Sequence, residues 1–147
     1  MKIAVGCDEA AYELKELLKR FLAEQGIEVE DFGAQAGETV PYPKVGFAVA
    51  EAVAAGRFDR AILCCGTGIG MAICANKVAG VRAAVGHDVY SAERARKSND
   101  AQVLTMGARV IGPELAKTVV AAWLKAEFEP PSAEKVAMIR AYEGGSR

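Results

Sequence analysis

The sequence predicts an α/β protein in which a five-stranded parallel sheet lies between two layers of helices. Three observations carry this prediction. Short β-prone runs alternate with helical periodicity along the whole chain, glycines stand at the boundaries, and the run RAILCC at 60–65 is almost wholly apolar, as expected for a central parallel strand. The 147 residues, 52% of them hydrophobic and 25% charged, suit a single domain over 1–147 with a buried core.

The strands are predicted from short β-prone runs. The run at 27–32 alternates apolar and acidic residues, so we expect a half-buried strand near the edge of the sheet. The predicted strands are 2–6, 27–32, 60–65, 81–85 and 103–106.

The helices are predicted from apolar residues that recur on one helical face. In the first helix, 9–25, that face consists of Leu14, Leu17, Leu18, Phe21 and Leu22. Pro43 suits the first turn of the second helix. Further helices are predicted over 71–77, 91–97, 114–125 and 134–142. Because Pro130 and Pro131 precede the last helix, we expect it to lie outside the sandwich, packed on a neighbouring subunit.

Composition excludes several classes of partner. The net charge of -1 gives no reason to expect nucleic acid or an anionic membrane. No apolar run approaches the roughly 20 residues of a membrane span, and the start lacks the apolar stretch of a signal peptide, so we expect a cytoplasmic protein. The only histidine is His87 and there is no C-x-x-C, so we expect no metal site. We expect thiols at Cys7, Cys64, Cys65 and Cys74, with Cys64 facing away from Cys65.

Polar and reactive residues follow the first and third predicted strands. Assuming the strand order 2-1-3-4-5, these two strands flank the switch point where open α/β sheets bind ligands. The residues concerned are 7–9 (CDE) and 65–70 (CGTGIG). The three glycines of CGTGIG allow close approach of the backbone to a ligand, and the next helix adds its positive N-terminal end. Such a loop suits an enediolate oxyanion or a phosphate, and Cys65 at its mouth is a usable base or nucleophile.

Rival interpretations of CGTGIG fail on spacing. A Walker A loop would need Gly-Lys-Ser/Thr, but this loop continues Gly70-Met71-Ala72. A dinucleotide fingerprint begun at Gly66 would need glycine at position 71, and a cysteine phosphatase loop would need arginine there; the residue is Met71. A receiver domain would need aspartate where Cys65 stands. For a glycine-rich turn taken alone, a tight strand-to-helix turn with an incidental buried cysteine remains open.

The loop does not stand alone. Matching pieces occur in order at 6–8 (GCD), 42–43 (YP), 65–70 (CGTGIG), 75–77 (ANK), 80–84 (GVRAA), 90–96 (YSAERAR), 99–100 (ND) and 106–116 (MGARVIGPELA). With these motifs the chain resembles the family of ribose-5-phosphate isomerase B and the galactose-6-phosphate isomerase subunits, from about residue 2 to about residue 129. The resemblance implies a Rossmann-like sandwich and an aldose–ketose isomerase of carbohydrate metabolism, of the ribose 5-phosphate/ribulose 5-phosphate (pentose phosphate) type.

The resemblance also implies the site. Cys65 would move a proton from C2 to C1 through a cis-enediolate, with Thr67 and Asp8 near the reacting end; one family branch uses a glutamate where this chain has Met71. Arg109 and Lys135 would bind phosphate. The oxyanion and the substrate would be held by Gly66, Gly68, Ile69, Gly70, Asn99 and Tyr42. The family needs no metal or organic cofactor, and its members are dimers or tetramers whose active site is completed across the subunit interface.

Three departures from the family pattern bear on the substrate. Glu9 and Ser98 stand where the family often has histidines, and only Lys135 remains where the C-terminal helix of the family carries two arginines. The second histidine resembles the group that opens the furanose of ribose 5-phosphate. We therefore raise the hypothesis that the substrate is a short open-chain sugar phosphate, such as erythrulose 4-phosphate/erythrose 4-phosphate. The alternative is that a water or His87 replaces the missing histidine, although a lone histidine is more often structural.

Other interpretations remain open. Glu9 would repel a phosphate, so either it points away, paired with a lysine, or the phosphate lies elsewhere. A cysteine nucleophile that forms a covalent intermediate lacks a histidine in a triad role. A non-catalytic sugar-phosphate-binding protein, or a subunit that needs an unlike partner, is distinguished by the activity of the purified chain alone.

Overall fold

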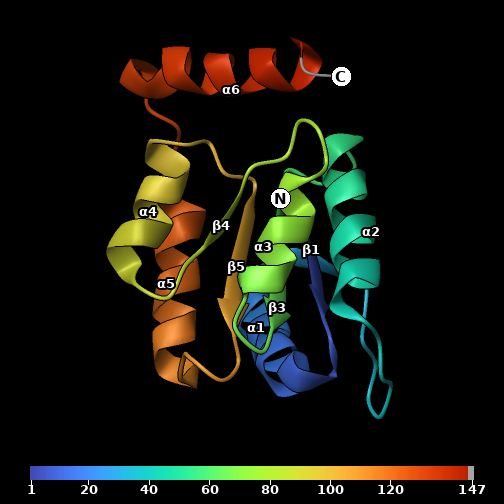
Figure 1. Cartoon of the computed structure of the whole chain (residues 1–147). Coiled ribbons are helices and arrows are strands. Elements are labelled where there is room, and N and C mark those ends of the chain that lie inside the picture. Colours follow the sequence, from blue (N-terminus) through green and yellow to red (C-terminus); the bar gives the residue numbers. More distant parts are fainter. Residues whose placement is uncertain (146–147) are drawn as a thin grey trace.

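The computed structural model describes residues 1–145 and contains a five-stranded, wholly parallel sheet (Figure 1). The strands are β1 (Lys2–Cys7), β2 (Glu28–Asp31), β3 (Arg60–Cys65), β4 (Ala83–Val85) and β5 (Val103–Gly107). Their order is β2-β1-β3-β5-β4, so the assumed order 2-1-3-4-5 is wrong at one end. The physical reason is burial: β5 is buried along its whole length and lies inside the sheet, whereas β4 is short, partly exposed and suited to an edge. Strands β1 and β3, which flank the expected site, pair with each other as predicted.

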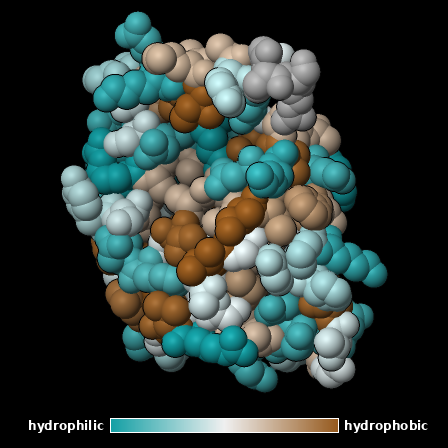
Figure 2. Space-filling model, in the orientation of Figure 1, coloured by the Kyte–Doolittle hydropathy of each residue, from teal (hydrophilic) through white to brown (hydrophobic). Residues whose placement is uncertain are grey.

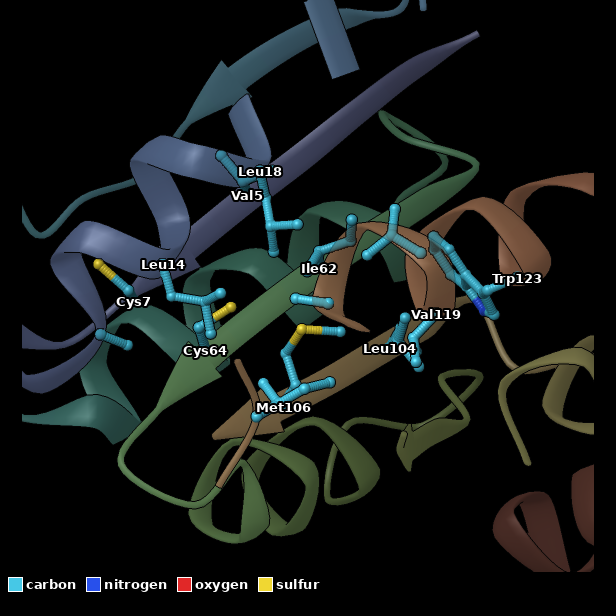
Figure 3. Close-up of a cluster of buried hydrophobic side chains, with 14 of the residues drawn as sticks. Val5, Cys7, Leu14, Leu18, Ile62, Cys64, Leu104, Met106, Val119 and Trp123 are labelled. Carbon is cyan, nitrogen blue, oxygen red and sulfur yellow. The ribbon is translucent and has the colours of Figure 1, made fainter. Parts of the chain in front are cut away.

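Helices cover both faces of the sheet, as predicted. They are η1 (Glu9–Ala11), α1 (Tyr12–Glu24), α2 (Tyr42–Ala54), α3 (Ile69–Asn76), α4 (Val89–Lys97), α5 (Pro113–Lys125), η2 (Pro130–Ser132) and α6 (Ala133–Gly145). One hydrophobic cluster joins the sheet to α1, α4 and α5 (Figure 3), and a second joins the opposite face to α2 and α3. None of the helices within residues 1–145 is long and apolar enough to span a membrane.

Successive residues of β3 enter different clusters. Ile62 and Cys64 pack in the cluster with α1 and α5 (Figure 3), whereas Leu63 and Cys65 pack in the cluster with α2 and α3. This alternation follows from the two-residue period of a strand and confirms that Cys64 faces away from Cys65. Of the two adjacent cysteines, only Cys65 therefore lies on the face of the sheet that α3 covers.

The C-terminal helix α6 lies outside the sandwich, as predicted, across the edge where the strands begin (Figure 1). It is anchored to segments that precede β4 and β5. The Arg140 guanidinium lies 3.6 Å from the Asp100 carboxylate, and the Glu143 carboxylate accepts a hydrogen bond of 2.6 Å from the Gly80 amide. Met138 and Ile139 leave apolar surface exposed on this helix. Its packing on a neighbouring subunit remains a prediction.

Candidate active site

A pocket of about 380 Å³ opens at the carboxyl ends of β1 and β3, where the sequence predicted a site. The lining residues come from the end of β3, from the segments that follow β1, β3 and β5, and from α2 and α3. They are Asp8, Tyr42, Cys65, Gly66, Thr67, Ile69, Gly70, Ile73 and Arg109. The structure thus brings together the predicted base, the predicted Thr67 and Asp8, and one of the two predicted phosphate ligands.

Cys65 ends β3 at the base of this pocket and is only 5% exposed. The Gly68 amide donates a hydrogen bond of 3.2 Å to its sulfur. The other cysteines in this part of the chain are poor candidates for proton transfer. Burial raises the pKa of the Cys7 thiol to about 11 and raises the pKa of Cys64 still further from its ordinary value. Both stay protonated at neutral pH, and neither is among the residues that line the pocket, whereas Cys65 is.

The glycines of the CGTGIG loop make room for neighbouring functional side chains. A Cβ atom on Gly66 would lie 2.7 Å from Arg109 Nη1, and one on Gly70 would lie 2.6 Å from Tyr42 Cζ. Gly68 has a φ of +80°, and a Cβ there would lie 2.8 Å from the backbone of Met106. Glycine is therefore required at 68 for the left-handed turn and for packing on β5. Close approach of a ligand stays the predicted role of these glycines, and the structure adds that they accommodate Arg109, Tyr42 and the end of β5.

The loop rests on the end of β5 through several polar contacts. Thr105 Oγ1 donates to the Gly68 carbonyl at 2.8 Å, and the Arg109 amide donates to the Gly66 carbonyl at 3.0 Å. The Gly107 amide donates to His87 Nε2 at 2.8 Å, so the lone pair of this ring nitrogen is already used. His87 does not line the pocket, which agrees with a structural role.

Two of the backbone amides assigned to the oxyanion are already paired. The Gly68 amide binds the Cys65 sulfur, and the Ile69 amide donates to Thr67 Oγ1 at 3.2 Å. Gly70 lies in the first turn of α3, where amides have no intrahelical acceptor. Its N–H group lies at the N-terminal, positive end of the helix, which favours negative charge nearby.

Asp8 and Glu9 are neighbours in sequence but accept hydrogen bonds from different amides, and only Asp8 lines the pocket. Asp8 caps η1 by accepting a hydrogen bond of 3.1 Å from the Ala10 amide and lines the pocket. Burial, and after it the Glu9 charge, raise the pKa of Asp8 above its ordinary value. Glu9 accepts a hydrogen bond of 3.2 Å from the Val40 amide and lies outside the pocket lining. Glu9 is thus held by a backbone amide rather than by a lysine, and the position of the phosphate stays a prediction.

Three predicted residues lie away from Cys65 in the same chain. Asn99 lines a separate groove of about 380 Å³ against α6, near the start of β4. Ser98 Oγ accepts two hydrogen bonds from the Arg94 guanidinium, at 2.9 and 2.6 Å. Lys135 is exposed on α6, and within residues 1–145 it forms no ion pair. A single chain therefore does not gather these residues around the pocket.

Fold and site together define an α/β protein whose pocket combines a strand-end cysteine, a glycine-rich loop and an exposed arginine. The family model described as Ribose/Galactose Isomerase matches residues 3–139. The chain belongs to this family, which confirms the resemblance drawn from its motifs, and it is an aldose–ketose isomerase.

The relatives carry different substrates in their names. The D-erythrulose-4-phosphate isomerase of Pectobacterium atrosepticum is 54% identical over 145 residues, 97% of this chain and 95% of that protein. The ribose-5-P isomerase B of Listeria innocua serovar 6a is 58% identical over 128 residues, 87% of this chain and 86% of that protein. The structure of Clostridium thermocellum ribose-5-phosphate isomerase B is 47% identical, covers 100% of both chains and superposes with a TM-score of 0.97.

Proposed function

We propose that this isomerase interconverts a ketose and an aldose phosphate with Cys65 as the proton-transferring base, and that its preferred substrate is the erythrulose 4-phosphate/erythrose 4-phosphate pair. The observation that carries the choice of substrate is at Ser98. Both lone pairs of its hydroxyl are used by Arg94, and a hydroxyl does not titrate near neutral pH. Ser98 therefore offers no acid to open a furanose. A tetrose 4-phosphate needs none, because its phosphorylated oxygen cannot close the ring.

The chemistry follows from the pocket. The Cys65 thiolate removes a proton from C1 of the ketose, the C–H electrons form the C1–C2 double bond, and the carbonyl oxygen becomes the enediolate oxyanion. The Gly70 amide and the N-terminal end of α3 stabilise that charge. Return of the proton to C2 completes the aldose: the C1 hydroxyl loses its proton and becomes the aldehyde carbonyl, and the C2 oxyanion gains a proton to become a hydroxyl. Asp8 and Thr67 lie beside these two oxygens and carry that proton between them. The exposed Arg109 guanidinium at the rim binds the phosphate.

The distribution of site residues supports an assembly of two or more copies. Asn99 and Lys135 lie away from the Cys65 pocket of their own chain, so we propose that a second copy supplies them. Figure 2 shows a hydrophobic patch over α3, where Ile69 and Ile73 are 55% and 56% exposed beside the pocket and Val85 lies next to them. A second copy seated on this patch would cover the mouth of the pocket and bury apolar surface.

Mixed assemblies test this sharing. Cys65→Ala and Asn99→Ala chains are each expected to be nearly inactive alone. If Asn99 acts on the pocket of another copy, mixing them after dissociation produces one intact site in each hetero-dimer, and about a quarter of wild-type activity returns in a statistical mixture of dimers. If Asn99 acts within its own chain, mixing restores nothing.

The substrate is tested by comparing kcat/KM for erythrulose 4-phosphate and ribose 5-phosphate. We expect a preference for the tetrose, and a strong preference for ribose 5-phosphate would contradict the proposal. Ribose 5-phosphate is the second candidate because relatives at 58% and 49% identity bear its name. The cytoplasm is the proposed location, since all four cysteines are free thiols. No isomerisation of either substrate by the folded chain would point to a partner-dependent subunit.

A further inference from the structure

Asp100 is the residue at which the backbone leaves α4 towards β5. Its φ of 49° is the one positive φ at a non-glycine residue in the described part of the chain. Around this turn the Asp100 amide donates to the Arg96 carbonyl at 3.1 Å, and the Ala101 amide donates to the Ala95 carbonyl at 2.8 Å. Helices often end through such a left-handed residue, which is usually glycine and sometimes asparagine. Aspartate tolerates this conformation better than most residues, and unlike glycine it also brings a carboxylate to the turn.

Three arginines from separate parts of the chain surround that carboxylate. Arg82, just before β4, and Arg96, on α4, lie 3.3 and 3.1 Å from its oxygens, and both are buried. Arg140, on α6, lies 3.6 Å away and is exposed. We call Asp100 and these three arginines the Asp100 cluster. It lies at the edge where the strands begin, outside the pocket of the same chain.

The Asp100 cluster holds the backbone of Asn99. Arg82 Nε donates to the Asn99 carbonyl at 3.0 Å and to the Asp100 carbonyl at 3.1 Å. The Asn99 side chain, in contrast, is exposed in the groove beside α6 and makes no hydrogen bond within residues 1–145. A backbone held by several charged contacts thus presents a free amide outward, which is the arrangement that a residue acting on another molecule requires.

We propose that Asp100 is a positioning residue: through its arginines and its left-handed backbone it aims the Asn99 amide at the pocket of a second copy. This inference rests on the proposed function, in which Asn99 stabilises the enediolate in the neighbouring chain. Arg140 lies on α6, so its ion pair with Asp100 connects the carboxylate to the helix that carries Lys135. One carboxylate then sets the orientation of both groups that a second copy would receive.

The test is a double-mutant cycle on the full-length protein. Asp100→Asn and Asp100→Gly both tolerate the left-handed backbone, so they remove the charge while retaining the turn. We expect each to lower kcat by about 10-fold with little change in KM. A wrongly oriented oxyanion donor stabilises the transition state less, whereas binding of the substrate in its ground state is unchanged. In an Asn99→Ala background the same substitutions should produce almost no further loss, because Asp100 acts through Asn99.

Arg140→Gln is the second variant, because Arg140 is exposed and its loss leaves no buried charge unpaired. It should produce a smaller fall in kcat that likewise disappears in the Asn99→Ala background. The matched control is Arg57→Gln, which breaks an exposed ion pair of 3.1 Å with Glu30 on β2, the strand at the opposite edge of the sheet from β4. We expect this control to retain wild-type kcat.

The outcomes separate the two proposals. Losses that add fully in the Asn99→Ala background would show that Asp100 is merely structural and would overturn the positioning role, with the isomerase intact. Wild-type kcat in folded Asp100→Asn and Arg140→Gln would also overturn it. Wild-type kcat in Asn99→Ala would remove the oxyanion role of Asn99 and this inference together. A wild-type protein that isomerises neither substrate would defeat the proposed function itself, and with it this inference.

Discussion

The amide of Gly68 donates a hydrogen bond of 3.2 Å to the sulfur of Cys65. This contact exists because β3 ends at Cys65 and the chain turns through a left-handed Gly68 directly into α3. An N–H group aimed at sulfur stabilises negative charge on it, and the N-terminal end of α3 acts in the same direction.

Cys65 and its neighbour Cys64 should respond oppositely to substitution. Cys65→Ala is expected to lower kcat by about 10²–10⁴-fold, the usual contribution of a positioned general base. Cys64→Ala should leave kcat unchanged and lower the free energy of unfolding by about 1 kcal/mol, because its buried thiol packs in the α1–α5 cluster. Steady-state kinetics and thermal unfolding of both variants check this. Similar kinetic losses in the two variants would contradict the role given to Cys65.

The acidic limb of the pH–rate profile should report the ionisation of Asp8, and the charge of Glu9 should shift its position. Burial and the Glu9 carboxylate raise the pKa of Asp8, and we expect activity to need ionised Asp8. Glu9→Gln removes one negative neighbour, so the pKa of Asp8 falls and the acidic limb of kcat/KM moves to lower pH. The matched control is Glu13→Gln, an exposed residue of α1 with the same change in charge. A limb that moves to higher pH, or moves equally in the control, would count against this role of Asp8.

Two glycines with the same φ of +80° should differ in their tolerance of alanine. A Cβ on Gly56 meets nothing within 4 Å, whereas a Cβ on Gly68 would lie 2.8 Å from the Met106 backbone. Gly56→Ala is expected to cost about 1–2 kcal/mol for the left-handed conformation alone. Gly68→Ala should cost about 1–3 kcal/mol more and lower kcat, because the loop must move off β5. Thermal unfolding should show the difference as about 2–4 °C of Tm for each kcal/mol.

Substrate preference should change at Ser98. Ser98→His supplies a group that titrates near neutral pH where the family resemblance places the ring-opening histidine. We expect kcat/KM for ribose 5-phosphate to rise relative to that for erythrulose 4-phosphate. Ser98→Ala, which releases Arg94 without adding an acid, should not raise it. If both variants change the ratio alike, the position does not govern ring opening.

The strands were predictable because each is a local run, but their order was not. Whether β4 or β5 lies beside β3 depends on burial against helices far away in sequence. The pocket was predictable to a large extent, because a parallel sheet gathers the ends of β1 and β3 at one edge and so joins Asp8 to Cys65 and Thr67.

The sequence did not predict the positions of charged residues whose partners lie far away in the chain. Lys15 lies on the apolar face of α1, fully buried, with Nζ 3.0 Å from Asp31 Oδ1, although a lysine in a helix is ordinarily expected in solvent. Arg82, Arg96 and Arg140 converge on Asp100 from separate parts of the chain, and their spacing in sequence forms no pattern. Their roles emerge only when the elements are placed together.

The most direct test of Cys65 as the base is deuterium exchange followed by NMR. Wild-type protein, Cys65→Ala and Cys64→Ala are each incubated in D2O with erythrulose 4-phosphate. We predict that wild type and Cys64→Ala replace a C1 hydrogen of the ketose with deuterium, and that Cys65→Ala leaves the C1 signals intact. Undiminished exchange by Cys65→Ala would show that another group moves the proton and would contradict the account.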